Sequence, residues 1–69
     1  MATTCFFEEK LKDKERDDRL DFEFGKTSWY GENLMYIRVG DTAVALDKAK
    51  GREVYEAMRS LGAYLGYEA

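Results

Sequence analysis

The clearest pattern of apolar and polar positions lies in residues 34–47, where two runs of strand-forming residues flank a Gly-Asp pair. Such a two-residue step between strands predicts a tight β-hairpin turn, and the turn length sets the pairing of the strands. The expected cross-strand pairs are Val39 with Thr42, Ile37 with Val44, and Met35 with Leu46. Because side chains alternate along a strand, one face of the hairpin is apolar. That face holds Met35, Ile37, Val39, Val44 and Leu46, and the other holds Leu34, Tyr36, Arg38, Ala43 and Ala45.

A second alternating segment, residues 19–24, precedes the hairpin. Leu20, Phe22 and Phe24 point to one side and Asp21 and Glu23 to the other, which predicts a half-buried antiparallel strand with an acidic outer face. The sequence Gly-Lys-Thr-Ser at 25–28 predicts that the chain turns there. Residues 29–33 are then expected to form a second irregular segment.

The N-terminal segment, residues 3–11, fits two structures. As a strand it places Cys5, Phe7, Glu9 and Leu11 on one face. As a helix it has Thr4 as its cap and Phe7 and Leu11 one turn apart. The Thr-Thr-Cys-Phe-Phe start favours the strand. Residues 12–18 contain no apolar side chain and are expected to form a solvated loop.

An amphipathic helix is expected after the hairpin. Asp47 is a good N-cap, and Gly66 is a suitable C-terminal stop. Between them an apolar stripe recurs at helical spacing, formed by Val54, Met58, Leu61 and Leu65. The predicted fold is α+β: a three- to four-stranded antiparallel sheet with one C-terminal helix packed on one face. The helix stripe is expected to meet a sheet core of Leu20, Phe22, Phe24, Met35, Ile37, Val39, Val44 and Leu46.

The 69 residues allow one small domain, residues 1–69, comprising a charged N-terminal strand and loop (1–18), antiparallel strands (19–46) and the helix (47–65). The single cysteine, Cys5, excludes an internal disulfide and favours a reducing cytosol. The N-terminus lacks the features of a signal peptide, and no apolar run is long enough for a bilayer. We therefore expect a soluble cytoplasmic protein with no membrane partner, either a monomer or a homodimer.

Catalytic and metal-binding motifs are missing from the sequence. With no histidine, the chain lacks a Cys/His zinc site and a histidine general base. Asp21 and Glu23 lie about 7 Å apart on one strand face, near the spacing of glycosidase carboxylates, but alternating strands often place two carboxylates so. The acidic run at 13–18 lacks the glycine and glutamate positions of an EF-hand loop. Cys5 lies beside phenylalanines, which favours a buried, inert thiol. We expect no enzyme, catalytic residue, cofactor, metal or small-molecule substrate.

The charge is unevenly distributed, because residues 8–23 hold eight acids and five bases while the rest of the chain is balanced. Carboxylates around aromatic anchors favour a binding surface for a basic partner. The candidate carboxylates are Asp17, Asp18, Asp21, Glu23 and Glu32, which would engage Lys and Arg of the target. The candidate anchors are Trp29, Tyr30 and Tyr36. The alternative is structural: Trp29 closes the end of a thin core and Tyr36 packs on Ala43 and Ala45.

Two other functions remain open. The expected helix carries Lys48, Arg52, Tyr55 and Arg59 on one face, with Lys50 in the first turn, which suits a small nucleic-acid-binding regulator. Glu53 and Glu56 interleave with these bases, as on an ordinary solvated face. The other alternative is a structural homo-oligomeric subunit that associates through the uncovered sheet face or a strand edge.

In size, charge placement and lack of cofactor motifs, the whole chain resembles small phage-encoded inhibitors such as the anti-CRISPR proteins. Many of those are small acidic domains that act as DNA mimics and occupy the positively charged nucleic-acid channel of a host complex. The resemblance implies a non-enzymatic inhibitor that works in the host cytoplasm. Its partner would be a basic, nucleic-acid-binding protein or complex such as a CRISPR effector.

Overall fold

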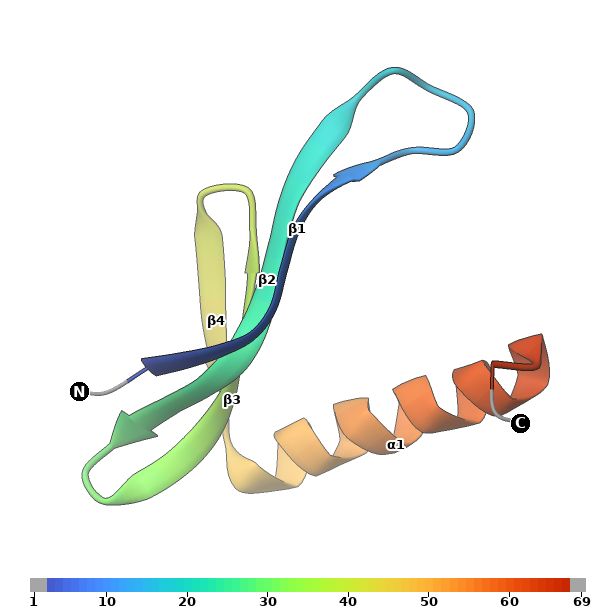
Figure 1. Cartoon of the computed structure of the whole chain (residues 1–69). Coiled ribbons are helices and arrows are strands. Elements are labelled where there is room, and N and C mark those ends of the chain that lie inside the picture. The colour runs from blue at the N-terminus through green and yellow to red at the C-terminus, as the bar shows by residue number, and fades with distance from the viewer. Residues whose placement is uncertain (1–2, 68–69) are drawn as a thin grey trace.

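A computed structural model describes residues 3–67 and shows a four-stranded antiparallel sheet followed by one helix (Figure 1). The strands lie in the order β1-β2-β3-β4, so each pairs with its neighbour in the chain. The elements are β1 (Thr3–Lys12), β2 (Arg19–Trp29), β3 (Glu32–Val39), β4 (Thr42–Leu46) and α1 (Lys48–Leu65). The α+β class is confirmed, and the sheet has the full four strands because residues 3–11 form a strand.

The β3–β4 hairpin has the pairing expected from its turn. Val39 pairs with Thr42, Ile37 with Val44, and Met35 with Leu46. Gly40 has φ 62° at the first turn position, where a type II′ turn needs a residue without a Cβ. The two-residue turn therefore places Met35, Ile37 and Val39 on one face of the sheet.

The expected turn at 25–28 is wrong, because β2 continues through it to Trp29 and the chain reverses at Tyr30 and Gly31. Gly25 serves a different purpose. A Cβ built on it would lie 2.1 Å from the Thr4 carbonyl oxygen and 3.0 Å from Tyr36 Cε1. The opposing strand also shifts register between Cys5 and Phe7, as at a β-bulge. Gly25 thus permits a close approach of β1 and Tyr36 to the β2 backbone.

The first hairpin extends beyond the rest of the sheet as an arm, here defined as residues 10–21 (Figure 1). The pairing of β2 with β3 begins at Phe22, so the end of β2 near Arg19 is paired with β1 alone. The connecting loop is closed by Asp13, whose carboxylate accepts hydrogen bonds from the backbone N–H groups of Glu15 and Arg16. The solvated loop expected at 12–18 is confirmed apart from Lys12, the last residue of β1.

The helix ends are those expected. The Asp47 carboxylate accepts a hydrogen bond from the Lys50 backbone N–H at 2.7 Å. Gly66 adopts the left-handed conformation with φ 79°, and the N–H of Tyr67 donates to the Gly62 carbonyl at 2.9 Å. This arrangement satisfies the last carbonyls of the helix as in a Schellman motif.

The helix contacts the sheet only near its start, and this corrects the expected core. Gly51 is buried against Met35 and Leu46, whose Cβ atoms lie 3.7 and 4.0 Å from the point where its own Cβ would be. Beyond that turn α1 diverges from the sheet (Figure 1). Met58 and Leu61, expected to cover the sheet, are 51% and 55% exposed, and Leu65 is exposed as well. Asp47 is the only residue between β4 and α1. The connection is therefore too short for the helix to reverse direction and lie along the sheet.

The buried residues of the sheet lie on the face expected to be open. This outer face carries Glu23, Gly25, Thr27, Tyr36 and Arg38, as the strand register requires. Tyr36 is only 7% exposed and Thr27 is buried, whereas no side chain within residues 3–67 is fully buried. Residues of both edge strands, Thr3 and Ala43 among them, line a shallow hollow beside Tyr36. The sheet therefore curls toward its outer face, around Tyr36.

Candidate functional site

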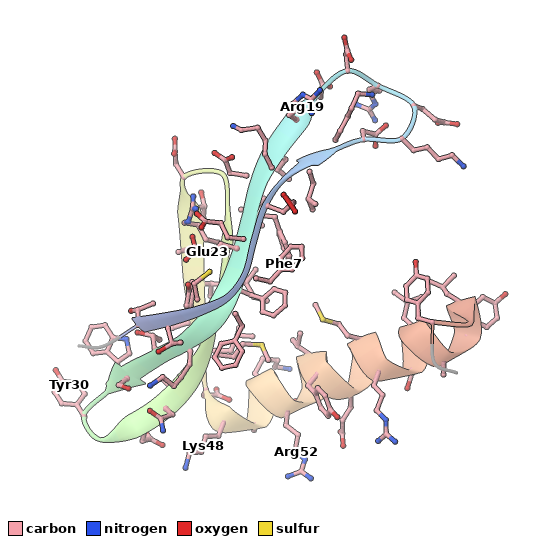
Figure 2. The ribbon with its side chains drawn as sticks, viewed as in Figure 1. Phe7, Arg19, Glu23, Tyr30, Lys48 and Arg52 are labelled. Carbon is pink, nitrogen blue, oxygen red and sulfur yellow. The ribbon has the colours of Figure 1, made fainter. Side chains whose placement is uncertain are left out.

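The predicted binding residues do not form one surface. They divide into three groups along a molecule with extents of 42 × 29 × 17 Å, and the second and third groups adjoin where Trp29 and Tyr36 line one hollow. The arm carries Asp17, Asp18 and Asp21, and the outer face of the sheet carries Glu23 and Tyr36. The β2–β3 turn and its flanks carry Trp29, Tyr30 and Glu32. Figure 2 shows the separation, with Arg19 on the arm, Glu23 at mid-sheet and Tyr30 at the far end.

The carboxylates of the arm are exposed and interspersed with bases. The Asp17 side chain is 99% exposed and lies 3.8 Å from Lys12 Nζ, and Asp21 lies 3.0 Å from Lys10 Nζ. Residues 10–21 contain five acids and five bases, so the arm is neutral as a whole. The negative balance of the N-terminal third comes instead from Glu8, Glu9 and Glu23.

Glu23 and Tyr36 belong to one hydrogen-bonded network with Arg38. The Tyr36 hydroxyl donates to Glu23 Oε2, and Arg38 donates to Glu23 Oε1 from Nε at 3.0 Å and from a terminal nitrogen at 2.7 Å. Arg38 also donates to the Gly40 carbonyl at 2.7 Å. The register places Arg38 directly opposite Glu23 and Tyr36 opposite Gly25, so all three side chains share the outer face. These contacts occupy three of the roughly four acceptor positions of the Glu23 carboxylate and leave it little capacity for a partner.

The network shifts the ionisation of its members. The hydrogen bonds from Tyr36 and then Arg38 favour the charged carboxylate and lower the pKa of Glu23. Its bond to that carboxylate raises the pKa of the Tyr36 phenol to about 12. The same carboxylate raises the pKa of Arg38. All three groups therefore keep their charge state at neutral pH, which suits a structural clamp between β2 and β3 and offers no proton donor or acceptor near neutrality.

The β2–β3 turn presents two adjacent aromatic side chains. Tyr30 is 97% exposed, and its ring centroid lies 5.8 Å from that of the partly exposed Trp29. Tyr30 also has φ 47°, the left-handed conformation that costs an ordinary residue about 1–2 kcal/mol. Glu32 pairs with Trp29 across the turn, and its carboxylate is 4.0 Å from Lys48 Nζ. The structure thus brings Trp29, Tyr30 and Glu32 together at one end of the sheet, as the sequence suggested.

Two features of the site differ from expectation. Cys5 is exposed, and its thiol donates to the Phe7 carbonyl at 3.5 Å. The predicted buried thiol is wrong because Cys5 lies on the edge strand β1, all of whose residues are exposed. Phe7 lies on the other face of the sheet from Cys5 and stacks on Phe24 at 5.4 Å between ring centroids. The β-bulge between Cys5 and Phe7 could not be seen in the alternation of the sequence, which placed Cys5 and Phe7 on one face.

The basic face of α1 is largely paired with carboxylates. Lys50 lies 3.1 Å from Glu53 and Arg52 lies 3.7 Å from Glu56, and Lys48 approaches Glu32. Lys48 and Arg52 point away from the sheet (Figure 2). All three pairs are solvent-exposed, and the two within α1 join residues one helical turn apart, as on an ordinary solvated helix face.

Within residues 3–67, no three Cys, Asp or Glu side chains gather closely enough to hold a metal ion. Over the same part of the chain, α1 is not apolar enough to cross a bilayer. Comparison of the chain with models of protein families, with curated proteins and with solved structures finds no match.

Proposed function

We propose that the protein is a non-enzymatic binding module that inhibits a host complex by occupying its basic, nucleic-acid-binding site. The observation that carries the proposal is the Trp29–Tyr30 turn. A large aromatic side chain held at positive φ and left 97% exposed costs folding energy and gains no burial in return. Contact with a partner accounts for both the positive φ and the exposure, because buried aromatic anchors are the residues that most often dominate protein interfaces.

The charges near this turn and on the arm suit a basic partner. Glu32 lies beside the aromatic pair, and Asp17 and Asp18 lie together on the loop of the arm. Because the arm is neutral as a whole, its carboxylates act through individual contacts with Lys and Arg rather than through a long-range field. The arm and the turn lie at opposite ends of the sheet, so a partner that engages both must extend along the length of the sheet.

The test is retention of the target from a bacterial lysate by the tagged protein, with nuclease-treated and untreated samples compared. The proposal predicts that a nucleic-acid-binding complex is retained after nuclease treatment and is displaced by added duplex DNA or by RNA. Tyr30→Asn is expected to weaken its binding more than tenfold, which is about 1.4 kcal/mol. Retention of nucleic acid alone, lost on nuclease treatment, would overturn the proposal in favour of the helix bases.

Matched controls distinguish a specific surface from general surface chemistry. Tyr64→Asn removes another highly exposed tyrosine, from α1, and is expected to leave binding unchanged. For the arm, Asp17→Lys with Asp18→Lys is compared with Glu53→Lys with Glu56→Lys, which changes the charge equally on the helix. Only the arm variant is expected to weaken binding. An equal loss of binding in both double variants would show that binding depends on the net charge of the protein and not on the arm.

A further inference from the structure

The chain exposes far more surface than a folded monomer of its mass. Its accessible surface is 5908 Å², whereas about 4,500 Å² is expected for a compact 8.0-kDa protein. Its radius of gyration is 13.8 Å, against about 11 Å for a compact chain of this length. The excess is roughly 1,400 Å² per chain, and much of it lies on two apolar surfaces.

The first surface is the apolar face of the sheet. By the strand register its apolar residues are Phe7, Leu11, Leu20, Phe22, Phe24, Met35, Ile37, Val39, Val44 and Leu46, and Thr4, Glu9, Lys26 and Thr42 lie on the same face. At its centre Phe7, Phe22 and Phe24 form a cluster with ring centroids 5.4–6.0 Å apart. Phe7, Leu11, Leu20, Val39 and Val44 are all exposed. Contiguous apolar area of this kind marks an interaction surface in a protein that remains in solution.

The second surface is the α1 stripe, defined as Val54, Met58, Leu61 and Leu65. It continues the side of the helix on which Gly51 lies, because residues 3, 7, 10 and 14 positions further on return to that side. Gly51 packs against Met35 and Leu46 of the apolar face. The stripe and the apolar face therefore border the same open wedge between α1 and the sheet, and Phe7 points into it (Figure 2).

We propose that two copies of this chain form a reciprocal dimer, in which the α1 stripe of each copy lies on the apolar sheet face of the other. The apolar face and the α1 stripe belong to the same chain, and neither covers the other within it. A second copy supplies a stripe for the apolar face and an apolar face for the stripe. The excess area amounts to about 2,800 Å² for two chains, within the range of obligate homodimers. Reciprocal exchange gives a closed two-fold assembly in which neither the apolar face nor the α1 stripe is left free for further growth.

The junction between β4 and α1 explains why the helix does not cover its own sheet. Asp47 is the only residue between them, and its carboxylate and carbonyl accept from the backbone N–H groups of Lys50 and Gly51 at 2.7 and 2.8 Å. The first turn is thereby fixed in direction, and Gly51 anchors it to Met35 and Leu46. Short connections of this kind favour exchange of an element between copies over closure within one chain.

The residues of the proposed dimer interface are different from those that carry the proposed function. Tyr30 and Asp17 lie outside the apolar face and the α1 stripe, so dimerisation leaves both accessible. A monomeric protein that still binds its target through Tyr30 would overturn the dimer alone. A dimer that retains no target would overturn the inhibitor alone.

The test is the molar mass of the untagged protein by light scattering on a sizing column, together with isotope-filtered NOEs in a mixture of labelled and unlabelled chains. We expect twice the chain mass of 8.0 kDa and NOEs between the Met58 or Leu61 methyls of one chain and the Phe7 or Phe22 ring of the other. A mass of 8.0 kDa, with these NOEs within one chain or missing, would overturn the proposal. A dimer without helix-to-sheet NOEs between chains would do so too.

A pair of variants locates the interface. Met58→Glu places a carboxylate in the α1 stripe and is expected to halve the mass or prevent folding. Ser60→Glu places the same group on the opposite side of α1 and is expected to keep the dimer. If Met58→Glu does not fold, the mass and NOEs of the unaltered protein still decide the question. A dimeric Met58→Glu protein would place the interface elsewhere.

Discussion

The Tyr36 hydroxyl donates a hydrogen bond to the Glu23 carboxylate, joining β3 to β2 on the outer face of the sheet. Arg38 binds the second oxygen of the same carboxylate, so an acid expected to face a partner is neutralised within the fold. Tyr36 is also the most buried apolar side chain of the described residues. This arrangement moves the predicted contact surface away from mid-sheet, toward the Trp29–Tyr30 turn and the arm.

The network predicts a loss of stability at high pH that depends on Tyr36. In the folded state its pKa is raised from 10.0 to about 12, so the unfolded chain loses the phenolic proton first. The contribution is present below pH 10.0 and is lost as the pH rises through about 12. Tyr36→Phe is expected to remove this dependence, measured as the urea midpoint of unfolding at a series of pH values. Tyr64→Phe, which alters an exposed tyrosine, should retain it.

At low pH the same network predicts that stability decreases as the pH falls. The folded-state pKa of Glu23 lies below its ordinary value of 4.5, so its contribution is present above that pH and declines as the pH falls through the lowered value. Glu23→Gln is expected to be less stable at neutral pH and to lose less stability on acidification. An unchanged acid slope in this variant would show that other carboxylates determine it.

Two glycines are expected to respond oppositely to alanine. At Gly25 the added methyl would overlap the Thr4 carbonyl and the Cys5 backbone, so β1 must move, at a cost of about 1–3 kcal/mol. At Gly51 the nearest side-chain atoms lie at 3.7 and 4.0 Å, ordinary contact distances, and the helix gains about 1 kcal/mol in propensity. Urea unfolding of Gly25→Ala and Gly51→Ala measures both. Equal effects would contradict the close approach at Gly25.

Tyr30→Asn is expected to raise stability, although the same change should weaken target binding. Asparagine tolerates the left-handed conformation better than tyrosine, and the nearly complete exposure of Tyr30 means that little packing is lost. A gain of about 1 kcal/mol in the free energy of unfolding is expected. The comparison is with Tyr64→Asn, which removes a helical tyrosine and should give no gain. A destabilised Tyr30→Asn protein would show that the Trp29 contact supports the fold.

Features set by local chemistry were predictable from the sequence. The Gly-Asp step determined the pairing of β3 with β4 because a two-residue turn permits a single register. Asp47 and Gly66 mark the two ends of α1, since caps act on backbone groups a few residues away. The aromatic turn and Glu32 were also correctly brought together, because they adjoin in the chain.

Features that depend on contacts between distant residues were not predictable. Gly25 resembled a turn residue, but its conformation is set by the approach of Thr4 and Tyr36. Glu23 resembled a free surface acid, yet strand pairing places it opposite Arg38. The amphipathic pattern of α1 showed that its stripe needs an apolar partner but could not identify that partner. The sequence determined the β3–β4 hairpin, the helix and their apolar faces through short-range preferences. Only the tertiary structure decided which faces meet, because the single-residue junction at Asp47 directs the helix away from its own sheet.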